Sequence, residues 1–114
     1  MDEIRKFIEN ITPMSDADWQ FFASKLQEVE LKKQAVLLKY GEVENHMSFI
    51  TKGIIRFYVP GDESDLTFGF LFEREFVTAY DSCLTRTPSK YQIETLTDAI
   101  LWRISHQDLE EVYE

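Results

Sequence analysis

Short runs of alternating apolar and polar residues fill most of this 114-residue chain after about residue 28. A period of two is typical of β-strands that bury one face. Gly and Pro separate several of the runs, as turns between strands require. We expect strands at residues 29–31, 35–38, 47–52, 54–59, 66–71, 92–96 and 100–104. Short strands at this close spacing predict an antiparallel sandwich or barrel.

Glycine and proline mark the turns that we expect between these strands. The Pro-Gly-Asp sequence of residues 60–62 predicts the turn of a hairpin. Gly41 and Gly53 each follow an apolar segment, where a tight reversal requires a positive φ. In residues 66–72, LTFGFLF, alternation places Leu66 and three phenylalanines on one face of a strand.

Two short helices are expected before the first strand. The first ends at Pro13 and carries apolar residues at helical spacing, namely Ile4, Phe7, Ile8 and Ile11. Ser15 is placed to cap the second, because its hydroxyl can accept a hydrogen bond from a backbone N–H of the first turn. The apolar stripe of this second helix consists of Trp19, Phe22 and Leu26.

A further helix is expected where the sequence ends. Ser105 is placed as its N-cap, and Asp108 comes three residues later, close to the capping-box pattern. Its apolar residues are Leu109, Val112 and Tyr113. A helix of this length is not stable alone. We therefore expect the native chain to continue beyond Glu114, and we expect this apolar face to contact the continuation.

The chain is acidic, with 21 Asp and Glu against 12 Lys and Arg and a net charge of −9. Binding to a nucleic-acid backbone needs clustered positive charge, and the longest basic run is Lys32 with Lys33. We therefore expect no DNA binding by this segment itself. The single cysteine, Cys83, cannot form an internal disulfide, and apolar stretches such as residues 68–72 are far too short to cross a bilayer. We expect a cytoplasmic protein without a membrane partner.

Five segments together resemble the sensory domain of the Crp/Fnr family of bacterial transcription regulators, which is similar to cyclic-nucleotide-binding domains. They are residues 11–22 (ITPMSDADWQFF), 37–42 (LLKYGE), 49–53 (FITKG), 96–99 (LTDA) and 104–109 (ISHQDL). The resemblance covers essentially the whole chain and so implies one domain over residues 1–114. The implied fold is mainly β, an antiparallel double-stranded β-roll (jelly-roll-like) with two short N-terminal helices and a C-terminal exit helix.

The same resemblance implies partners for the full-length protein. A long helix after residue 114 would form a homodimer. A winged helix-turn-helix after that helix would contact DNA, so DNA is expected as a partner only through a segment that this sequence does not include. Effector binding in the roll would then reorient the two DNA-binding domains, as a shift between two populated arrangements.

The polar stretch after Phe76 corresponds in this resemblance to the family's phosphate-binding cassette. In the family a Gly-Glu pair comes after the Phe, an Arg comes about ten residues later, and these groups hold the ribose and the cyclic phosphate. Here the pair is Thr78 and Ala79, and the arginine position is Ser89, with Lys90 next to it. Each charge-assisted contact is worth roughly 1.5–3 kcal/mol, so the loss of both predicts no cAMP binding at ordinary affinity.

We expect the effector to be a different, unidentified small molecule that the cassette binds. The candidate binding residues are Thr78, Ala79, Tyr80, Asp81, Ser82, Arg86, Ser89 and Lys90. Arg86 and Lys90 could partly replace the missing anion contact if they face inward, although Lys does not reproduce a bidentate Arg. The alternative is a cassette that binds nothing and only closes the roll.

No catalytic, metal or cofactor site is predicted. His46 and His106 are the only histidines, and neither pairs with the other or with Cys83 at metal-ligand spacing. Ser82 lacks the flanking glycines of a nucleophile elbow. We therefore expect no enzyme activity and no cofactor. Two other functions stay open: a stand-alone cyclic-nucleotide or small-ligand-binding module without a DNA-binding domain, and a cupin-like metalloenzyme, for which two separated histidines are a poor ligand set.

Overall fold

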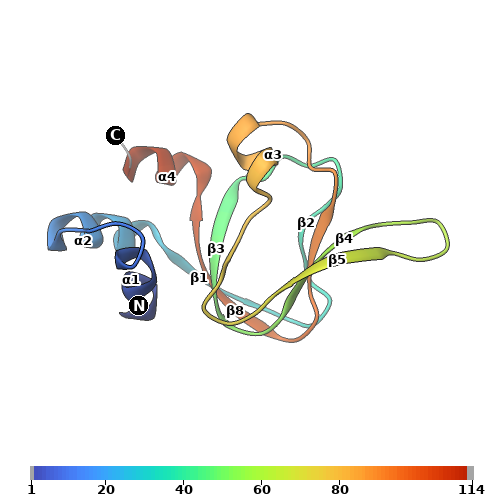
Figure 1. Cartoon of the computed structure of the whole chain (residues 1–114), viewed down its shortest axis with the longest axis horizontal. Helices are drawn as coiled ribbons and strands as arrows, with labels where there is room; N and C mark the ends of the chain where they lie inside the picture. Colours follow the sequence, from blue (N-terminus) through green and yellow to red (C-terminus); the bar gives the residue numbers. More distant parts are fainter. Residues whose placement is uncertain (1, 113–114) are drawn as a thin grey trace.

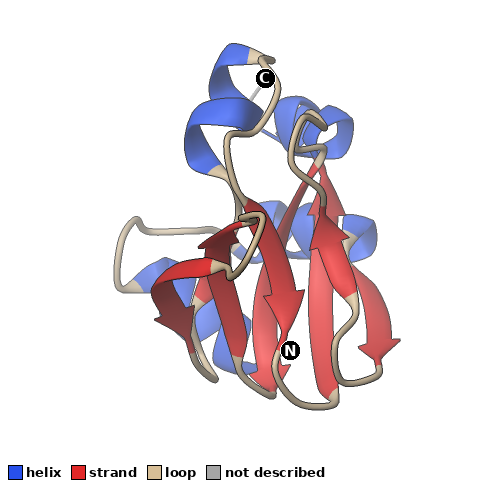
Figure 2. Ribbon diagram, turned by 90° about the vertical axis from the view of Figure 1, so that its right-hand side faces the viewer, coloured by secondary structure: helices blue, strands red, loops and turns tan. Residues whose placement is uncertain are grey.

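The computed structural model describes residues 2–112 and contains two antiparallel four-stranded sheets that face each other as a roll (Figures 1 and 2). One sheet has the strand order β1-β8-β3-β6 and the other β2-β7-β4-β5. The strands are β1 (Gln27–Leu31), β2 (Val36–Leu38), β3 (His46–Lys52), β4 (Ile55–Val59), β5 (Leu66–Leu71), β6 (Phe76–Val77), β7 (Gln92–Thr95) and β8 (Ala99–Ser105). The helices are α1 (Asp2–Glu9), α2 (Asp16–Lys25), α3 (Tyr80–Thr85) and α4 (His106–Val112). The predicted fold class, a mainly β antiparallel roll with short helices, is confirmed.

The core of the roll lies between the two sheets. Ile50 of β3 and Leu101 of β8 are fully buried from one sheet, and Ile55 of β4 and Ile93 of β7 from the other. Burying one such side chain is worth roughly 1.5–3 kcal/mol. Phe49, next to Ile50, is also fully buried, because helices cover the opposite face of its sheet.

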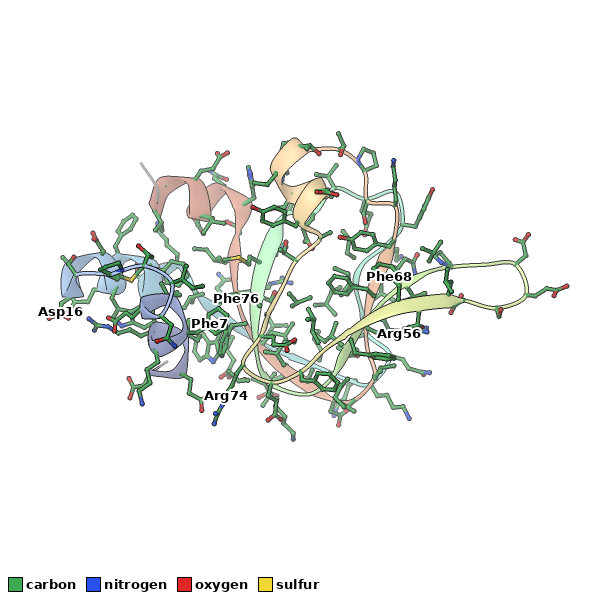
Figure 3. All side chains as sticks on the ribbon, viewed as in Figure 1. Phe7, Asp16, Arg56, Phe68, Arg74 and Phe76 are labelled. Carbon is green, nitrogen blue, oxygen red and sulfur yellow. The ribbon has the colours of Figure 1, made fainter. Side chains whose placement is uncertain are left out.

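Helices α1, α2 and α4 pack together on the outer face of the β1-β8-β3-β6 sheet (Figure 1). The buried members of their shared cluster are Ile4, Phe22, Leu26, Phe49 and Ile104. Phe7 of α1 contacts Phe76 of β6 edge to face, with ring centroids 5.1 Å apart (Figure 3). Leu109 and Val112 of α4 pack against this cluster as well. Tyr113, which we expected on the same face, lies outside the described residues.

The predicted start of α2 is correct, and the predicted end of α1 is wrong. The side-chain oxygen of Ser15 accepts the Asp18 N–H over 3.1 Å, which confirms the cap of α2. Helix α1 ends at Glu9, before Pro13 is reached. The Ile11 N–H donates to the carbonyl of Ile8, three residues earlier, which is the tighter hydrogen bond of a 3₁₀ turn. This turn directs Ile11 outward. Ile11 is consequently 73% exposed and does not belong to the apolar stripe.

The predicted glycine turns are confirmed. Gly41 has a φ of +88° and Gly53 a φ of +110°. A Cβ at Gly53 would lie 2.8 Å from both the Cβ of Ala99 and the carbonyl oxygen of Asp98. The turn between β3 and β4 therefore packs closely against the turn between β7 and β8.

A bulge divides the single phenylalanine face that alternation predicts for β5. The register between β4 and β5 shifts after Phe57, which leaves Phe68 as an extra residue. Phe68 consequently lies on the same side as Phe57, with ring centroids 6.0 Å apart, whereas Phe70 pairs with Arg56 on the other side. Figure 3 shows Phe68 and Arg56 on opposite sides of the hairpin. The prediction was wrong because a sequence does not show where a strand gains an unpaired residue.

Candidate functional site

The cassette, residues 76–91, contains the six-residue helix α3. A helix of this length is not stable by itself, so contacts with the rest of the domain must hold it. Ala79 precedes α3 without a side-chain hydrogen bond, and Arg86 ends it in the left-handed conformation with a φ of +59°. Figure 1 shows α3 at one end of the roll, near the start of β3.

Glu44, in the loop between β2 and β3, supplies the cap that Ala79 lacks. One carboxylate oxygen accepts the Ala79 N–H over 3.1 Å, and the other accepts the His46 N–H over 3.2 Å. Glu44 is only 6% exposed. Burial raises the pKa of this carboxyl above its ordinary value, although the N–H donors act in the opposite direction. Glu44 was not among the predicted site residues, because a charged loop residue carries no sequence signal of burial.

Ser82 and Arg86 complete the connection between α3 and this loop. The Glu44 N–H donates to Ser82 Oγ over 2.9 Å, and the buried Ser82 hydroxyl donates to the Thr87 carbonyl over 2.6 Å. The Arg86 guanidinium donates to the Glu44 carbonyl over 2.8 Å and to the side-chain oxygen of Asn45. These bonds direct Arg86 onto the protein's own loop.

A cavity of about 180 Å³ lies beside α3 and forms the candidate binding site. Its lining residues are Asp81, Ser82, Thr87, Pro88, Ser89, Lys90 and Tyr91. Asp81, Ser82, Ser89 and Lys90 are thus the predicted residues that the fold brings together. Thr87, Pro88 and Tyr91 also line the cavity. They were not among the predicted site residues, although all three lie within the cassette.

The other predicted residues lie outside this cavity. The Thr78 hydroxyl donates to the carbonyl of His46 over 3.0 Å. Ala79 is fully buried under Glu44, and Tyr80 is 65% exposed. Arg86 is bonded to the loop before β3. Thr78, Ala79 and Arg86 therefore hold the cassette in place, and none of the four residues lines the cavity.

Burial and two nearby carboxylates affect the titratable groups beside the cavity. Burial raises the pKa of the Tyr91 hydroxyl, and the charges of Asp81 and Glu44 raise it further. Burial also raises the pKa of the Cys83 thiol, with Glu44 acting in the same direction. Cys83 therefore stays protonated and is not an activated nucleophile.

The loop that holds α3 also contacts the exit helix. The Asn45 carbonyl accepts the N–H of His106, the first residue of α4, over 2.7 Å. Ser105 Oγ accepts the Asp108 N–H over 3.0 Å, which confirms the predicted cap. A cavity of about 290 Å³ lies at this junction and is lined by Asn45, His46, Arg86, Ser105, His106 and Gln107. Residues 44–46, which we call the joining loop, therefore contact both helices.

Another cleft lies away from the cassette. It measures about 770 Å³ and is lined by residues of several turns, among them Lys33, Gly53, Phe72 and Asp98. No residue of α3 or α4 lines it, so a ligand there has no direct path to the exit helix. We therefore place the candidate site at the cassette, where geometry connects the cavity to α4.

Two further features concern metal and membrane. Within residues 2–112, no group of three His, Cys, Asp or Glu side chains is arranged to hold a metal ion. No helix in that range is long and apolar enough to cross a bilayer.

Comparison with protein families identifies the domain. Residues 28–114 match the family model described as the cyclic nucleotide-binding domain. The chain belongs to this family. The match includes α3, α4 and every strand of the roll, apart from Gln27 at the start of β1. Cyclic nucleotide-binding domains are regulatory modules and not a family of enzymes, so the cupin-like alternative is not supported.

Solved structures share the fold of this cyclic nucleotide-binding domain. The catabolite activator protein of Thermus thermophilus has a TM-score of 0.74 at 13% identity, over 89% of this chain and 47% of that one. The sensor domain of the transcriptional regulator DNR from Pseudomonas aeruginosa has a TM-score of 0.74 at 18% identity, over 89% and 71%. The regulatory subunit of a cAMP-independent protein kinase A from Trypanosoma brucei has a TM-score of 0.75 at 13% identity, over 87% and 36%.

At these identities the likeness shows the fold alone. The chain spans about half the length of the catabolite activator protein that it matches. A search of curated protein sequences finds no significant match.

Proposed function

We propose that this domain senses a small-molecule effector for a Crp/Fnr-like transcription regulator and relays binding to a DNA-binding domain C-terminal to it. Two of the structural neighbours are named as a catabolite activator protein and as the sensor domain of a transcriptional regulator. The observation that carries the proposal is the hydrogen-bonded path from α3 through the joining loop to α4. A change at the cassette cavity would reach the exit helix along this path.

The proposed effector is a small molecule other than cAMP. Ser89 stands at the arginine position, Arg86 is bonded to the joining loop, and Glu44 already occupies the Ala79 N–H. The cavity, at about 180 Å³, is smaller than the roughly 300–1,000 Å³ of sites for drug-sized ligands. A compact molecule suits this volume better than a nucleotide.

In the full-length protein we propose that effector binding shifts the population between two arrangements of α3 and α4. A helix beyond residue 114 would join two copies as a homodimer and carry the change to a winged helix-turn-helix. The acidic sensing domain, with its net charge of −9, would not itself contact DNA.

Thermal unfolding with and without saturating cAMP or cGMP tests the effector proposal. A ligand at a hundred times its Kd stabilises a domain by roughly 2.7 kcal/mol, a shift of the order of ten degrees at this size. We expect no shift with either nucleotide. A shift of that size would overturn the claim that ordinary cyclic-nucleotide binding is lost. Lys90→Gln, with Lys6→Gln on the exposed side of α1 as a control outside the cassette, would then show whether Lys90 supplies the anion contact.

A DNA-binding measurement on a longer chain tests the regulator proposal. The chain would be extended by its own downstream sequence, roughly seventy residues, which is enough for a small domain. We expect the longer protein to bind DNA and the isolated domain not to. If the downstream sequence encodes no such domain, or the longer protein binds no DNA with any ligand, the stand-alone ligand-binding module replaces the regulator.

A further inference from the structure

Every polar group of Glu44 forms a hydrogen bond with the cassette or with a residue next to it. Its N–H donates to Ser82 Oγ, and its carbonyl accepts from Arg86. Its two carboxylate oxygens accept the N–H groups of Ala79 and His46. One residue outside the cassette therefore holds the residue before α3, the middle of α3 and the residue after it.

The next residue extends these contacts to the exit helix. The side-chain oxygen of Asn45 accepts from Arg86, and its backbone carbonyl accepts from the His106 N–H over 2.7 Å. Two neighbouring residues of one loop thus hold α3 on one side and the start of α4 on the other. The contacts of these two residues form a contiguous path between α3 and the start of α4.

We propose that Glu44 is a positioning residue that joins the cassette helix to the exit helix, so that α3, the joining loop and the start of α4 open and close as one unit. The joint itself is built from the contacts above. Its role in signalling rests on the proposed function, because only a sensing domain has a signal to pass from α3 to α4.

The Glu44 carboxylate is buried, so the joint is sensitive to the loss of any hydrogen bond that this carboxylate accepts. Within residues 2–112 its carboxylate has no ion-pair partner within 4.0 Å. The ionisable groups that face it come from several elements, namely Arg103 of β8, Arg86 after α3, His46 of β3, Cys83 of α3 and Tyr91 before β7. A buried carboxylate held only by backbone N–H groups is costly once any of them is lost. Ser82 lines the cavity and accepts the backbone N–H of Glu44. A ligand that moves Ser82 would therefore disturb Glu44 directly.

Amide hydrogen exchange of the 114-residue protein tests the joint without any effector. Glu44→Gln keeps the shape but leaves a single acceptor oxygen for two N–H groups, so one buried N–H loses its partner. We expect the Ala79 and His106 amides to exchange roughly tenfold faster, and by a common factor, because one opening exposes both. The Ile50 amide, which donates to the Glu75 carbonyl in the roll, should not change.

The matched control is Glu42→Gln. Glu42 lies in the same loop and is exposed, and its carboxylate also accepts a backbone N–H, from Lys39 over 2.8 Å. We expect no change at Ala79 or His106 in this variant. Faster exchange at Ala79 alone would reduce Glu44 to a cap of α3 and overturn the proposal, and so would unchanged rates at both amides. A rise that includes Ile50 would show general destabilisation and would also overturn it.

A pH titration of the wild-type protein gives a second readout that does not depend on a variant folding. The amide chemical shifts of Ala79 and His106 should share one titration midpoint, above the ordinary Glu value of 4.5. Other ionisable groups lie near these amides, so the shared component is the one that Glu44→Gln removes and Glu42→Gln keeps. No shared midpoint in the wild-type protein would overturn the joint. Failure of the effector proposal would leave these results unaffected, since no ligand is used.

Discussion

Glu44 and Ser82 are joined by a buried hydrogen bond of 2.9 Å, from the backbone N–H of Glu44 to the side-chain oxygen of Ser82. The same hydroxyl donates to the Thr87 carbonyl over 2.6 Å. One side chain therefore satisfies two backbone groups that lie far apart in the sequence. It also lines the cassette cavity, so a ligand there would compete with both bonds.

Ser82→Ala should lower the free energy of unfolding by about 1–3 kcal/mol, because it leaves a buried N–H and a carbonyl without partners. Urea unfolding measures this change. Ser24→Ala is the control, since its exposed hydroxyl donates only to Phe21 in its own helix, and it should change stability by less than about 0.5 kcal/mol. Equal losses in the two variants would contradict the importance of the buried bond.

Gly53→Ala should destabilise the domain more than Gly41→Ala. Both residues have a positive φ, so each substitution carries a backbone cost of roughly 1–2 kcal/mol. Only at Gly53 would the new Cβ also meet Ala99 and the Asp98 carbonyl at 2.8 Å, whereas nothing lies within 4 Å at Gly41. Thermal or urea unfolding of the two variants gives the comparison. A smaller effect at Gly53 would show that the turns can separate without cost.

The wild-type protein should gain stability relative to Glu44→Gln as the pH falls from 7 towards 4.5. The pKa of Glu44 is raised in the folded state by burial, so the folded protein binds this proton more tightly than the unfolded chain. The cost of the buried charge is therefore fully present above the folded pKa and disappears below the unfolded value.

Urea unfolding of both proteins at several pH values measures this difference. The pKa of His46 is lowered by burial and by Arg103, but His46 is common to both proteins and its effect largely cancels. Glu42→Gln should show no such trend against the wild type. A stability difference that is constant, or that grows as the pH rises, would contradict the assignment of a raised pKa to Glu44.

Phe68→Ala should cost about 1–2 kcal/mol more than Phe70→Ala. The two side chains are equally exposed, at 53% and 52%, so loss of apolar burial is similar. Phe68 alone contacts other rings, with centroids 6.0 Å from Phe57 and 5.3 Å from Tyr91, and each aromatic pair contributes roughly 0.5–1.5 kcal/mol. Urea unfolding tests the difference. Equal costs would show that these ring contacts add nothing to stability.

The roll and its turns were predictable because they depend on local patterns. Alternation identifies strands, and a left-handed turn strongly favours glycine, as at Gly53. The cap at Ser15 is equally local. The bulge at Phe68 depends on how β5 pairs with β4, which the sequence of β5 alone does not show. Alternation therefore placed Phe68 and Phe70 on one face, although Phe68 has no partner in β4.

The candidate site was only partly predictable, for the same reason. Cavity residues such as Ser89 and Lys90 could be predicted from the resemblance, because they lie within the cassette itself. Glu44 could not, since its burial depends on Ala79 and Ser82 arriving from another part of the chain. Arg86 was expected to be available for an anion if it faced inward, yet its guanidinium is bonded to the joining loop.

The shared packing of α1, α2 and α4 decides where a reporter can be attached. A dye or surface tether at the N-terminal helices would sit beside the exit helix, where Lys25 pairs with Glu111 over 3.4 Å. The β4–β5 hairpin instead projects away from the body of the domain (Figure 1). Because Cys83 is buried, a Ser64→Cys variant in the exposed hairpin tip would offer a thiol for selective labelling. Immobilising the domain there would leave both the cassette cavity and α4 free.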